Sequence, residues 1–467
     1  MHHRVTSRIR AIRRVASAVA FTSAWLSVSG CTLDDMVGAE ELPPDVTDPA
    51  ATETRKGAIA AYNGALVFFR QAFGGSGGFV STSGVLTDEL ESSDQTIDAR
   101  RIPEGGDAGE GVYSRLQRVR GQAAQAIGLL TNFAPGSEAL VGHMYAIQAY
   151  AEIFLAELFC SGIPLSTLDY KGDFTYKPGS STEEVYRHAL ALLDTAATLV
   201  ADSARLVNLV RVGRARALLG LGEFAEAARA VADVPDEYRY AIRYSGVRSI
   251  RGVDTDEQHF ATIESYRTNP NQTFAWNLTV GDREGRNGLD YVSSGDPRTQ
   301  TTATWGENGR YRRIFHPSKY PVDGSGAIVL ASGIEARLVE AEAALREGRV
   351  ESWLATLNHL RRTMWPTIEP AVSGPLPDLT DPGSDAARVD LLFRERAFWL
   401  FLTGQRQGDL RRLIRHYGRS QDEIYPVGPY PDPWKGDTQY GSDVDLPVPN
   451  SERISNPYYK GCIARGA

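Results

Sequence analysis

The chain has 467 residues and contains 50 Lys and Arg against 58 Asp and Glu, which gives a formal net charge of −8 at pH 7. Nucleic acids and anionic membrane surfaces bind proteins through basic patches, so this acidic balance argues against both. We therefore expect no nucleic-acid partner.

The first thirty residues have the pattern of a secretory signal peptide. Five arginines precede a mostly apolar run from Val15 to Val28, and small residues follow it up to Cys31. The alternative is a membrane-spanning helix, but that needs roughly 20 predominantly apolar residues, and serines and a threonine dilute this shorter run. Val28-Ser29-Gly30-Cys31 resembles the bacterial lipobox, in which the cysteine thiol is acylated. The pattern predicts a lipoprotein signal peptide over 1–30 and lipidation of Cys31, with acyl chains such as palmitate as the membrane anchor.

Residues 31–48 combine several acids and prolines with few large apolar side chains, which predicts a flexible tether after the lipidated cysteine. Removing residues 1–30 takes away five arginines and no acids. The mature chain then has 45 basic and 58 acidic residues and a formal charge of −13.

Two cysteines remain in the mature chain, Cys160 and Cys462. An even pair in an exported protein favours a disulfide, which would join the C-terminal tail to a helix near residue 155. The alternative is two buried thiols.

Helical periodicity recurs along residues 49–467 without a clear linker, so we expect one mainly α-helical domain. Small hydroxyl residues ahead of acids at Ser181–Glu184 are typical of a helix start. The predicted helices are 49–72, 110–132, 138–160, 182–201, 205–220, 223–232, 334–347, 350–362, 386–403 and 408–416.

Two helix pairs, within residues 209–235 and 334–366, share one plan. Each has small and apolar residues at helical spacing, a tight turn at a glycine (Gly222 or Gly348), a second helix and then a proline. Both resemble tetratricopeptide hairpins, whose small residues let two antiparallel helices approach closely. The alternative is a generic helical hairpin.

Residues 236–330 differ from the rest, because they are rich in Tyr, Trp, Asn, Thr, Gly and Asp and have few helical patterns. We expect a loop-rich insertion with short hairpins, and long loops on a rigid scaffold are common binding regions. Aromatic rings stack on the C–H faces of sugars while amides and charged groups meet the hydroxyls. The candidate ligand-binding rings are Trp276, Tyr291, Trp305 and Tyr311. Alternatively, these rings anchor the loops to the helical body.

The sequence contains no HExxH, CxxC, GxSxG or Walker-type motif. We therefore expect no catalytic residues, no metal site and no cofactor. Acid pairs such as Asp88 and Glu89 would suit a glycosidase, but a sequence does not give the distance between two carboxylates.

Residues 390–416 place six apolar residues, Ala397 to Leu402, between two dense groups of charge. A segment apolar on every face belongs in a core, and this one is too short to span a bilayer. We expect Gly404 to end its helix and Asp409 to cap the next one. The arginines are expected to bind carboxylates and helix-end carbonyls.

Several segments together resemble the SusD/RagB family of outer-membrane nutrient-binding lipoproteins. Trp399 and Thr403 stand where the family often has glutamates, which marks a divergent member. The matching segments are Glu395-Arg396, Gly404-x-Arg406 and Asp409–Arg412, the run 446–452 (LPVPNSE) with Asn456-Pro457, and the helices within 146–166 and 181–196.

The resemblance implies a single SusD-like domain over 49–467, built from a helical body with repeat hairpins, long loops and short β-hairpins. It further implies a lipid-anchored protein on the exterior of the outer membrane. Such a protein binds oligosaccharide or peptide and delivers it to a TonB-dependent, SusC-like β-barrel. The alternatives are a surface glycosidase or peptidase, and a helical-repeat scaffold of the cell envelope.

Overall fold

The computed structural model describes residues 52–75, 77–92, 96–244, 278–305, 313–320, 326–430 and 438–467. The chain divides into two units, 1–48 and 49–467. The predicted signal peptide, Cys31 and the tether lie outside the described residues.

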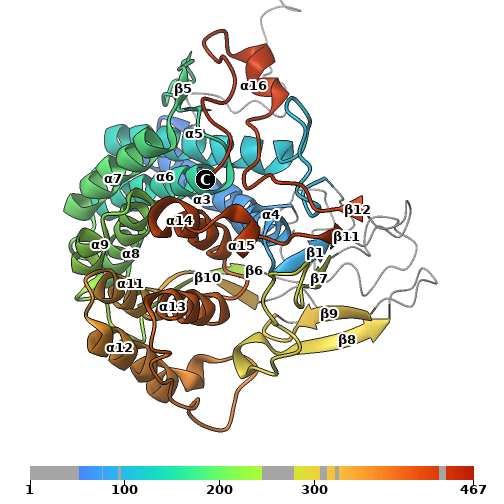
Figure 1. Ribbon diagram of the computed structural model, residues 1–467. Helices are drawn as coiled ribbons and strands as arrows, with labels where there is room; N and C mark the ends of the chain where they lie inside the picture. Colours follow the sequence, from blue (N-terminus) through green and yellow to red (C-terminus); the bar gives the residue numbers. More distant parts are fainter. Residues whose placement is uncertain are drawn as a thin grey trace, which may run out of the picture. The chain divides into compact units, whose positions relative to one another are not determined.

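The N-terminal half of the domain is a layer of long helices around a central one (Figure 1). α6 (Glu138–Leu158) is that central helix, and it packs against four others in this half. Every residue from Ala146 to Leu158 is buried, which is the pattern of a helix enclosed on all faces. Its neighbours are α3 (Arg55–Gly74), α5 (Glu110–Phe133), α7 (Thr182–Leu199) and α8 (Ala204–Leu221).

The helix start predicted at Ser181 is confirmed. The Ser181 side chain accepts the backbone N–H of Glu184, and the Glu184 side chain accepts the N–H of Ser181. This reciprocal capping box satisfies two N–H groups that the first turn of α7 leaves without partners.

The two predicted hairpins are present. α8 is followed by α9 (Phe224–Val231), and α11 (Gly333–Arg346) is followed by α12 (Val350–Thr363). Their turn glycines, Gly222 and Gly348, have φ of 79° and 73°, a left-handed conformation that favours glycine. α9 also packs against α11, so the hairpins stack as repeats do.

The C-terminal helices pack against the second repeat hairpin and also against helices of the N-terminal half. α13 (Asp385–Trp399) packs against α11, and α14 (Arg406–Tyr417) packs against α4, α6 and α8. Three short helices were not predicted: α4 (Phe79–Leu86), α15 (Gln421–Ile424) and α16 (Asn450–Ser455). A disulfide joins Cys160 to Cys462, and Ile463 N donates to Ser161 O at 2.7 Å beside it.

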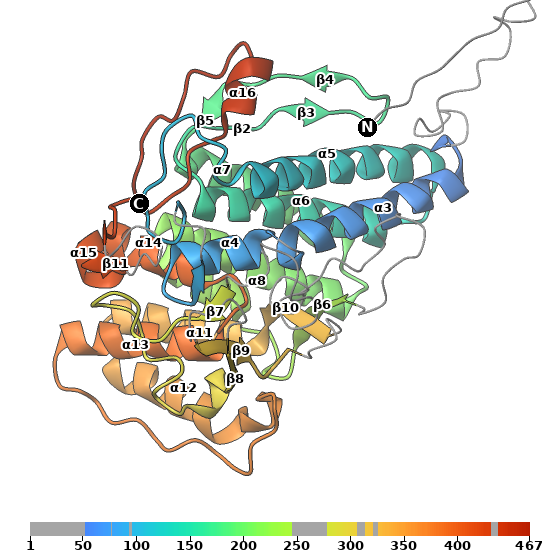
Figure 2. The same ribbon diagram turned by 90° about the vertical axis from the view of Figure 1, so that its right-hand side faces the viewer.

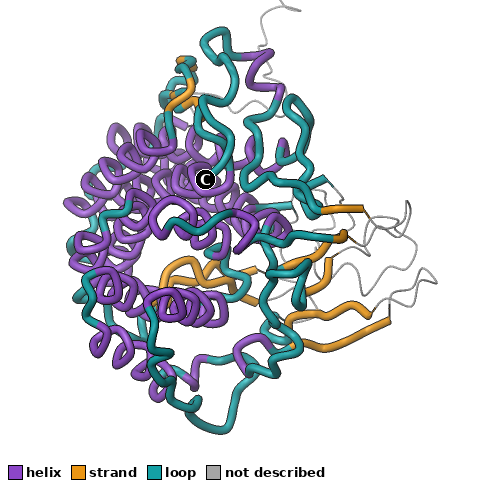
Figure 3. Tube along the Cα trace, viewed as in Figure 1, coloured by secondary structure: helices purple, strands orange, loops and turns teal. Residues whose placement is uncertain are grey.

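The strands of the described residues form only antiparallel pairs, and helices dominate (Figure 3). The prediction of a mainly α-helical fold with short hairpins is therefore confirmed. Two pairs lie near the disulfide, β2 (Ile163–Pro164) with β5 (Gly179–Ser180) and β3 (Thr167–Leu168) with β4 (Phe174–Thr175). The other pairs are β1 (Leu90–Ser92) with β7 (Leu278–Val280), β6 (Arg239–Tyr244) with β10 (Gly326–Ser332), β8 (Thr301–Trp305) with β9 (Arg313–Pro317), and β11 (Pro429–Tyr430) with β12 (Thr438–Gln439).

Within the described residues, no helix combines the length and the hydrophobicity needed to cross a bilayer.

Candidate functional site

The structure places the four predicted ligand-binding rings differently: one is buried, one ends a strand, and two lie outside the described residues. Tyr291 is fully buried, with its ring stacked at 5.4 Å from Phe398 and 5.1 Å from Phe401. The prediction that Tyr291 faces a ligand is therefore wrong, because its ring completes the core beneath the loops. Trp305 is the last residue of β8. Trp276 and Tyr311 lie outside the described residues.

Asn287, which the sequence places near these rings, also has a structural role. Its amide nitrogen donates to the backbone oxygen of Tyr425 at 3.1 Å and to that of Asp422. These bonds join the loop after β7 to the segment around α15.

The acid pair Asp88 and Glu89 lies in the core. Arg406 binds Asp88 with two hydrogen bonds of 2.7 and 2.9 Å. Glu89 accepts the backbone N–H of Leu402 at 2.9 Å, and burial raises the pKa of Glu89 to about 7. Both carboxyls thus hold the turn between α13 and α14 in place, and neither is exposed to a substrate.

A buried ion network joins the helices on either side of this turn to α11. We call it the α13–α14 corner, and it comprises Glu342 of α11, Arg396 of α13, and Asp409 and Arg412 of α14. Asp409 binds Arg396 with two hydrogen bonds of 2.9 Å, and Arg412 binds both Asp409 and Glu342 at 2.9 Å. Burial alone raises the pKa of the Asp409 carboxyl, but Arg396 and Arg412 outweigh that effect and lower it. The corner is structural.

The prediction that arginines bind helix-end carbonyls is confirmed by Arg411, which donates to Ala156 O, Glu157 O and Phe159 O, each at 2.9 Å. The predicted cap of α14 was wrong. α14 begins at Arg406, so Asp409 lies inside the first turn and faces the core.

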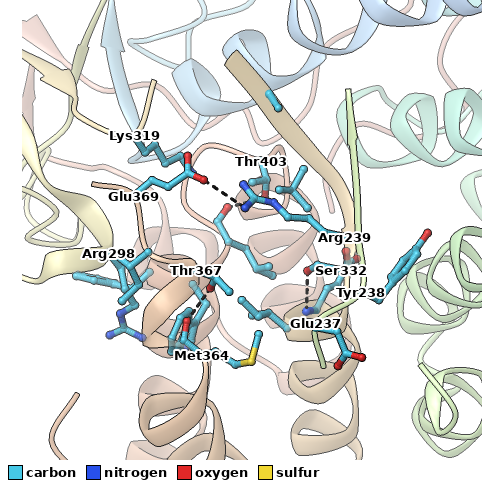
Figure 4. Close-up of a pocket in the computed structure, with 18 of the residues that line it drawn as sticks. Glu237, Tyr238, Arg239, Arg298, Lys319, Ser332, Met364, Thr367, Glu369 and Thr403 are labelled. Carbon is cyan, nitrogen blue, oxygen red and sulfur yellow. Dashed lines mark hydrogen bonds and ion pairs between the residues drawn. The ribbon is translucent and has the colours of Figure 1, made fainter. Parts of the chain in front are cut away.

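A partly open cavity of about 110 Å³ lies between the β6–β10 pair and the end of α13 (Figure 4). Arg239 and Glu369 line it and form an ion pair of 3.3 Å. Lys319 lines it too, and burial lowers the pKa of Lys319 to about 7. An engineered cavity of about 150 Å³ holds one benzene molecule, so this cavity is too small for an oligosaccharide.

A larger hollow of about 450 Å³ lies between α5, the β3–β4 hairpin and α16. We call it the α5–α16 groove. Phe174 and Tyr176 line it and are 53% and 37% exposed, with their rings edge to face at 4.8 Å. The sequence analysis missed both residues. Two aromatic rings at alternate positions of the polar run KGDFTYKPGS indicate rings on one exposed face of a hairpin, and that pattern was available.

In the described part of the chain, His, Cys, Asp and Glu side chains do not gather into a group of three that would hold a metal ion.

Neither a protein-family model nor a curated protein sequence matches the chain. Solved structures match it over most of its length. A SusD superfamily protein from Bacteroides vulgatus aligns with a TM-score of 0.62 at 13% identity, over 88% of this chain and 99% of its own. The surface glycan-binding protein A of Bacteroides thetaiotaomicron aligns with a TM-score of 0.61 at 12% identity, over 88% of this chain and 100% of its own.

A laminarin-binding SusD-like protein aligns with a TM-score of 0.60 at 14% identity, over 88% of this chain and 99% of its own. These identities are low, but each alignment covers most of this chain and nearly all of the other. The motifs quoted from the sequence and the architecture of the domain thus lead to one answer: the chain has the SusD-like fold.

Proposed function

We propose that the protein is a non-catalytic, cell-surface lipoprotein that binds oligosaccharide and delivers it to a TonB-dependent transporter of the outer membrane. The observation that carries this proposal is the match of the whole domain to proteins described as glycan-binding, two of which are the surface glycan-binding protein and the laminarin-binding protein. A shared fold alone does not fix a ligand, so the ligand needs direct measurement.

The anchor and the location rest on the sequence. Cys31 after a basic and then apolar leader is the proposed lipidation site, and the acidic residues that follow it resemble surface-export signals of related lipoproteins. A lipid anchor and a tether would let the domain meet both an extracellular glycan and a β-barrel partner in the same membrane.

The acid pair Asp88 and Glu89 gives little support to a glycosidase. The reaction needs two carboxyls that flank the scissile bond, whereas Asp88 is paired with Arg406 and Glu89 is held by the backbone of Leu402. Both are buried. This favours binding over hydrolysis.

A binding screen tests the proposal. The lipidated full-length protein, purified in detergent, is offered a panel of oligosaccharides and peptides, and retained ligands are analysed for cleavage. We expect binding of at least one oligosaccharide without release of shorter products. Products that accumulate with time would favour the surface glycosidase or peptidase.

The loop-rich region and the partner are tested separately. Trp276→Ala and Trp305→Ala should each weaken oligosaccharide binding, and unchanged affinity in both would remove these rings from the site. Affinity purification from membranes should recover a large β-barrel protein. Recovery of periplasmic assembly factors alone would favour the envelope scaffold.

A further inference from the structure

Large exposed apolar side chains gather at one end of the domain. In the described part of the chain they are Phe174, Tyr176, Ile454, Tyr458 and Ile463, all in the segment 163–180 or after residue 450. Exposed apolar groups that cluster in this way often mark an interaction site. Phe174 and Tyr176 also line the α5–α16 groove, which makes them the first residues to consider.

One face of α5 forms the floor of the groove. Its lining positions 110, 113, 114, 117, 118, 121 and 122 recur at intervals of three and four, which places them on a single helix face. That face is polar and partly exposed, and it includes Ser114, Gln117, Arg118 and Gln122. Ser114, Arg118 and Gln122 are at least partly exposed and offer polar groups to a ligand, whereas the Gln117 amide already donates to Tyr113 and to Pro164 O.

Phe174 and Tyr176 form the aromatic wall of the groove, and the β3–β4 hairpin that bears them is fixed to the α5 floor. The β3–β4 hairpin packs on two glycines of α5, since a Cβ at Gly121 would lie 3.3 Å from Leu168 and one at Gly128 would lie 2.7 Å from Tyr170. Arg120 Nη1 donates to Ser166 O at 3.1 Å. Phe174 and Tyr176 thus stand on a fixed support, and little conformational entropy would be lost when a ligand binds them.

The third wall is α16, which is tied to the other two. Tyr113 of α5 donates to Glu452 at 3.1 Å, and Ser451 donates to Glu110 at 2.8 Å. Asn456 donates to Lys177 O beside the hairpin at 2.8 Å. Figure 2 shows β3 and β4 running alongside α5 with α16 at one end of the hairpin.

The lining favours a neutral ligand rich in hydroxyls. Glu110, Glu452 and Arg118 give the groove one cation against two anions, so an acidic polymer would meet net repulsion. Hydroxyls both donate and accept, which matches the amides, serines and carboxylates of the floor. The two rings supply an apolar surface for a C–H face. A volume of about 450 Å³ falls within the usual range for small-molecule sites, roughly 300–1,000 Å³.

We propose that the α5–α16 groove is a binding site for neutral oligosaccharides, in which Phe174 and Tyr176 are the sugar-stacking residues. The groove is separate in sequence from the loop-rich region 236–330. This inference rests on the proposed glycan-binding function and gives it a second contact surface.

The test compares variants on the full-length protein with the neutral oligosaccharide that binds best among cello-, laminari-, malto-, manno- and xylohexaose, measured by calorimetry. The double variant Phe174→Ala/Tyr176→Ala should lower affinity at least tenfold, which corresponds to about 1.4 kcal/mol. Tyr458→Ala is the matched control, because Tyr458 is 58% exposed at the same end but does not line the groove. Its affinity should be unchanged. An oligogalacturonate of the same length should bind at least tenfold more weakly than the neutral probe.

The outcomes separate this inference from the function it rests on. If the wild-type protein binds an oligosaccharide and the double variant binds it equally well, the groove proposal is wrong while glycan binding stands. If the wild-type protein binds none of the five neutral probes, the groove proposal is wrong. If it also binds no oligosaccharide of the wider panel, the proposed function is wrong as well. Loss of peptide binding, with oligosaccharide binding intact, would assign the groove to a peptide and overturn the proposal.

Discussion

The α13–α14 corner and the α5–α16 groove both contain several charged residues, but those residues have different roles in the two places. In the corner, Arg396, Asp409 and Arg412 are at most 6% exposed and every one is bound to an opposite charge. In the groove, Phe174 and Tyr176 are exposed and the floor is partly open to solvent. Density of charge in a sequence therefore says little about ligand binding. Burial and pairing decide which residues hold the fold together and which are available to a ligand.

The largest expected effect is in the corner. Asp409→Ala removes the carboxylate between Arg396 and Arg412 and leaves buried charge without its partner, which should lower the free energy of unfolding by about 3–5 kcal/mol. Asp390→Ala is the control on the neighbouring helix α13, because Asp390 is 67% exposed in its pair with Arg419. Its cost should be about 0.5 kcal/mol or less. Urea denaturation measures both, and equal losses would contradict the structural role of the corner.

The disulfide comes next, because it links the tail that carries α16 to the end of α6. Cys160→Ser/Cys462→Ser should lower the free energy of unfolding by about 2–5 kcal/mol. It should also weaken oligosaccharide binding, since α16 forms one wall of the groove. A thiol assay on the unfolded, unreduced wild-type protein should find neither cysteine reactive. Two reactive thiols would show that the bond does not form.

A buried carboxyl at the edge of the corner gives a pH-dependent effect. Burial raises the pKa of Glu335 to about 7 from the ordinary 4.5, and Gln405 donates to it at 2.9 Å. Between these values the folded protein binds more protons than the unfolded chain, so the stability from this group falls as the pH rises from 4.5 to 7. In Glu335→Gln that loss is absent. The stability advantage of the wild type over the variant should shrink by a few kcal/mol between pH 5 and 7.5, and a constant difference would contradict the raised pKa.

The smallest effect on stability is expected in the groove. Phe174→Ala/Tyr176→Ala should change the free energy of unfolding by about 0.5 kcal/mol or less, because both side chains are exposed. A loss above about 2 kcal/mol would place the rings with the structural residues of the corner rather than with ligand contacts. Denaturant midpoints of the double variant and Tyr458→Ala, measured side by side, make the comparison direct.

Much of the fold was predictable because the residues that start and end its helices are the types that favour those positions in any helix. Ser181 caps α7, and Gly222 and Gly348 end α8 and α11 in the conformation that glycine favours. α4 was missed because its sequence, FVSTSGVL, follows a glycine-rich turn and is too short to show a helical period. α16 was missed because prolines surround it.

The site was less predictable because exposure is a tertiary property. Tyr291 and Tyr176 are the same residue type in similar polar segments, but Tyr291 stacks against Phe398 and Phe401 whereas Tyr176 lines a groove. Packing partners far along the chain decide the difference, and no local pattern gives them. The motifs around Arg396 and Asp409 belong to the buried ion network of the corner in this chain.

A crystal structure of the protein with its tightest-binding neutral oligosaccharide tests the central claim most directly. We predict density for at least one sugar ring against Phe174 and Tyr176, with hydroxyls in contact with the α5 floor. Sugar density confined to other parts of the domain, with an empty α5–α16 groove, would contradict the claim.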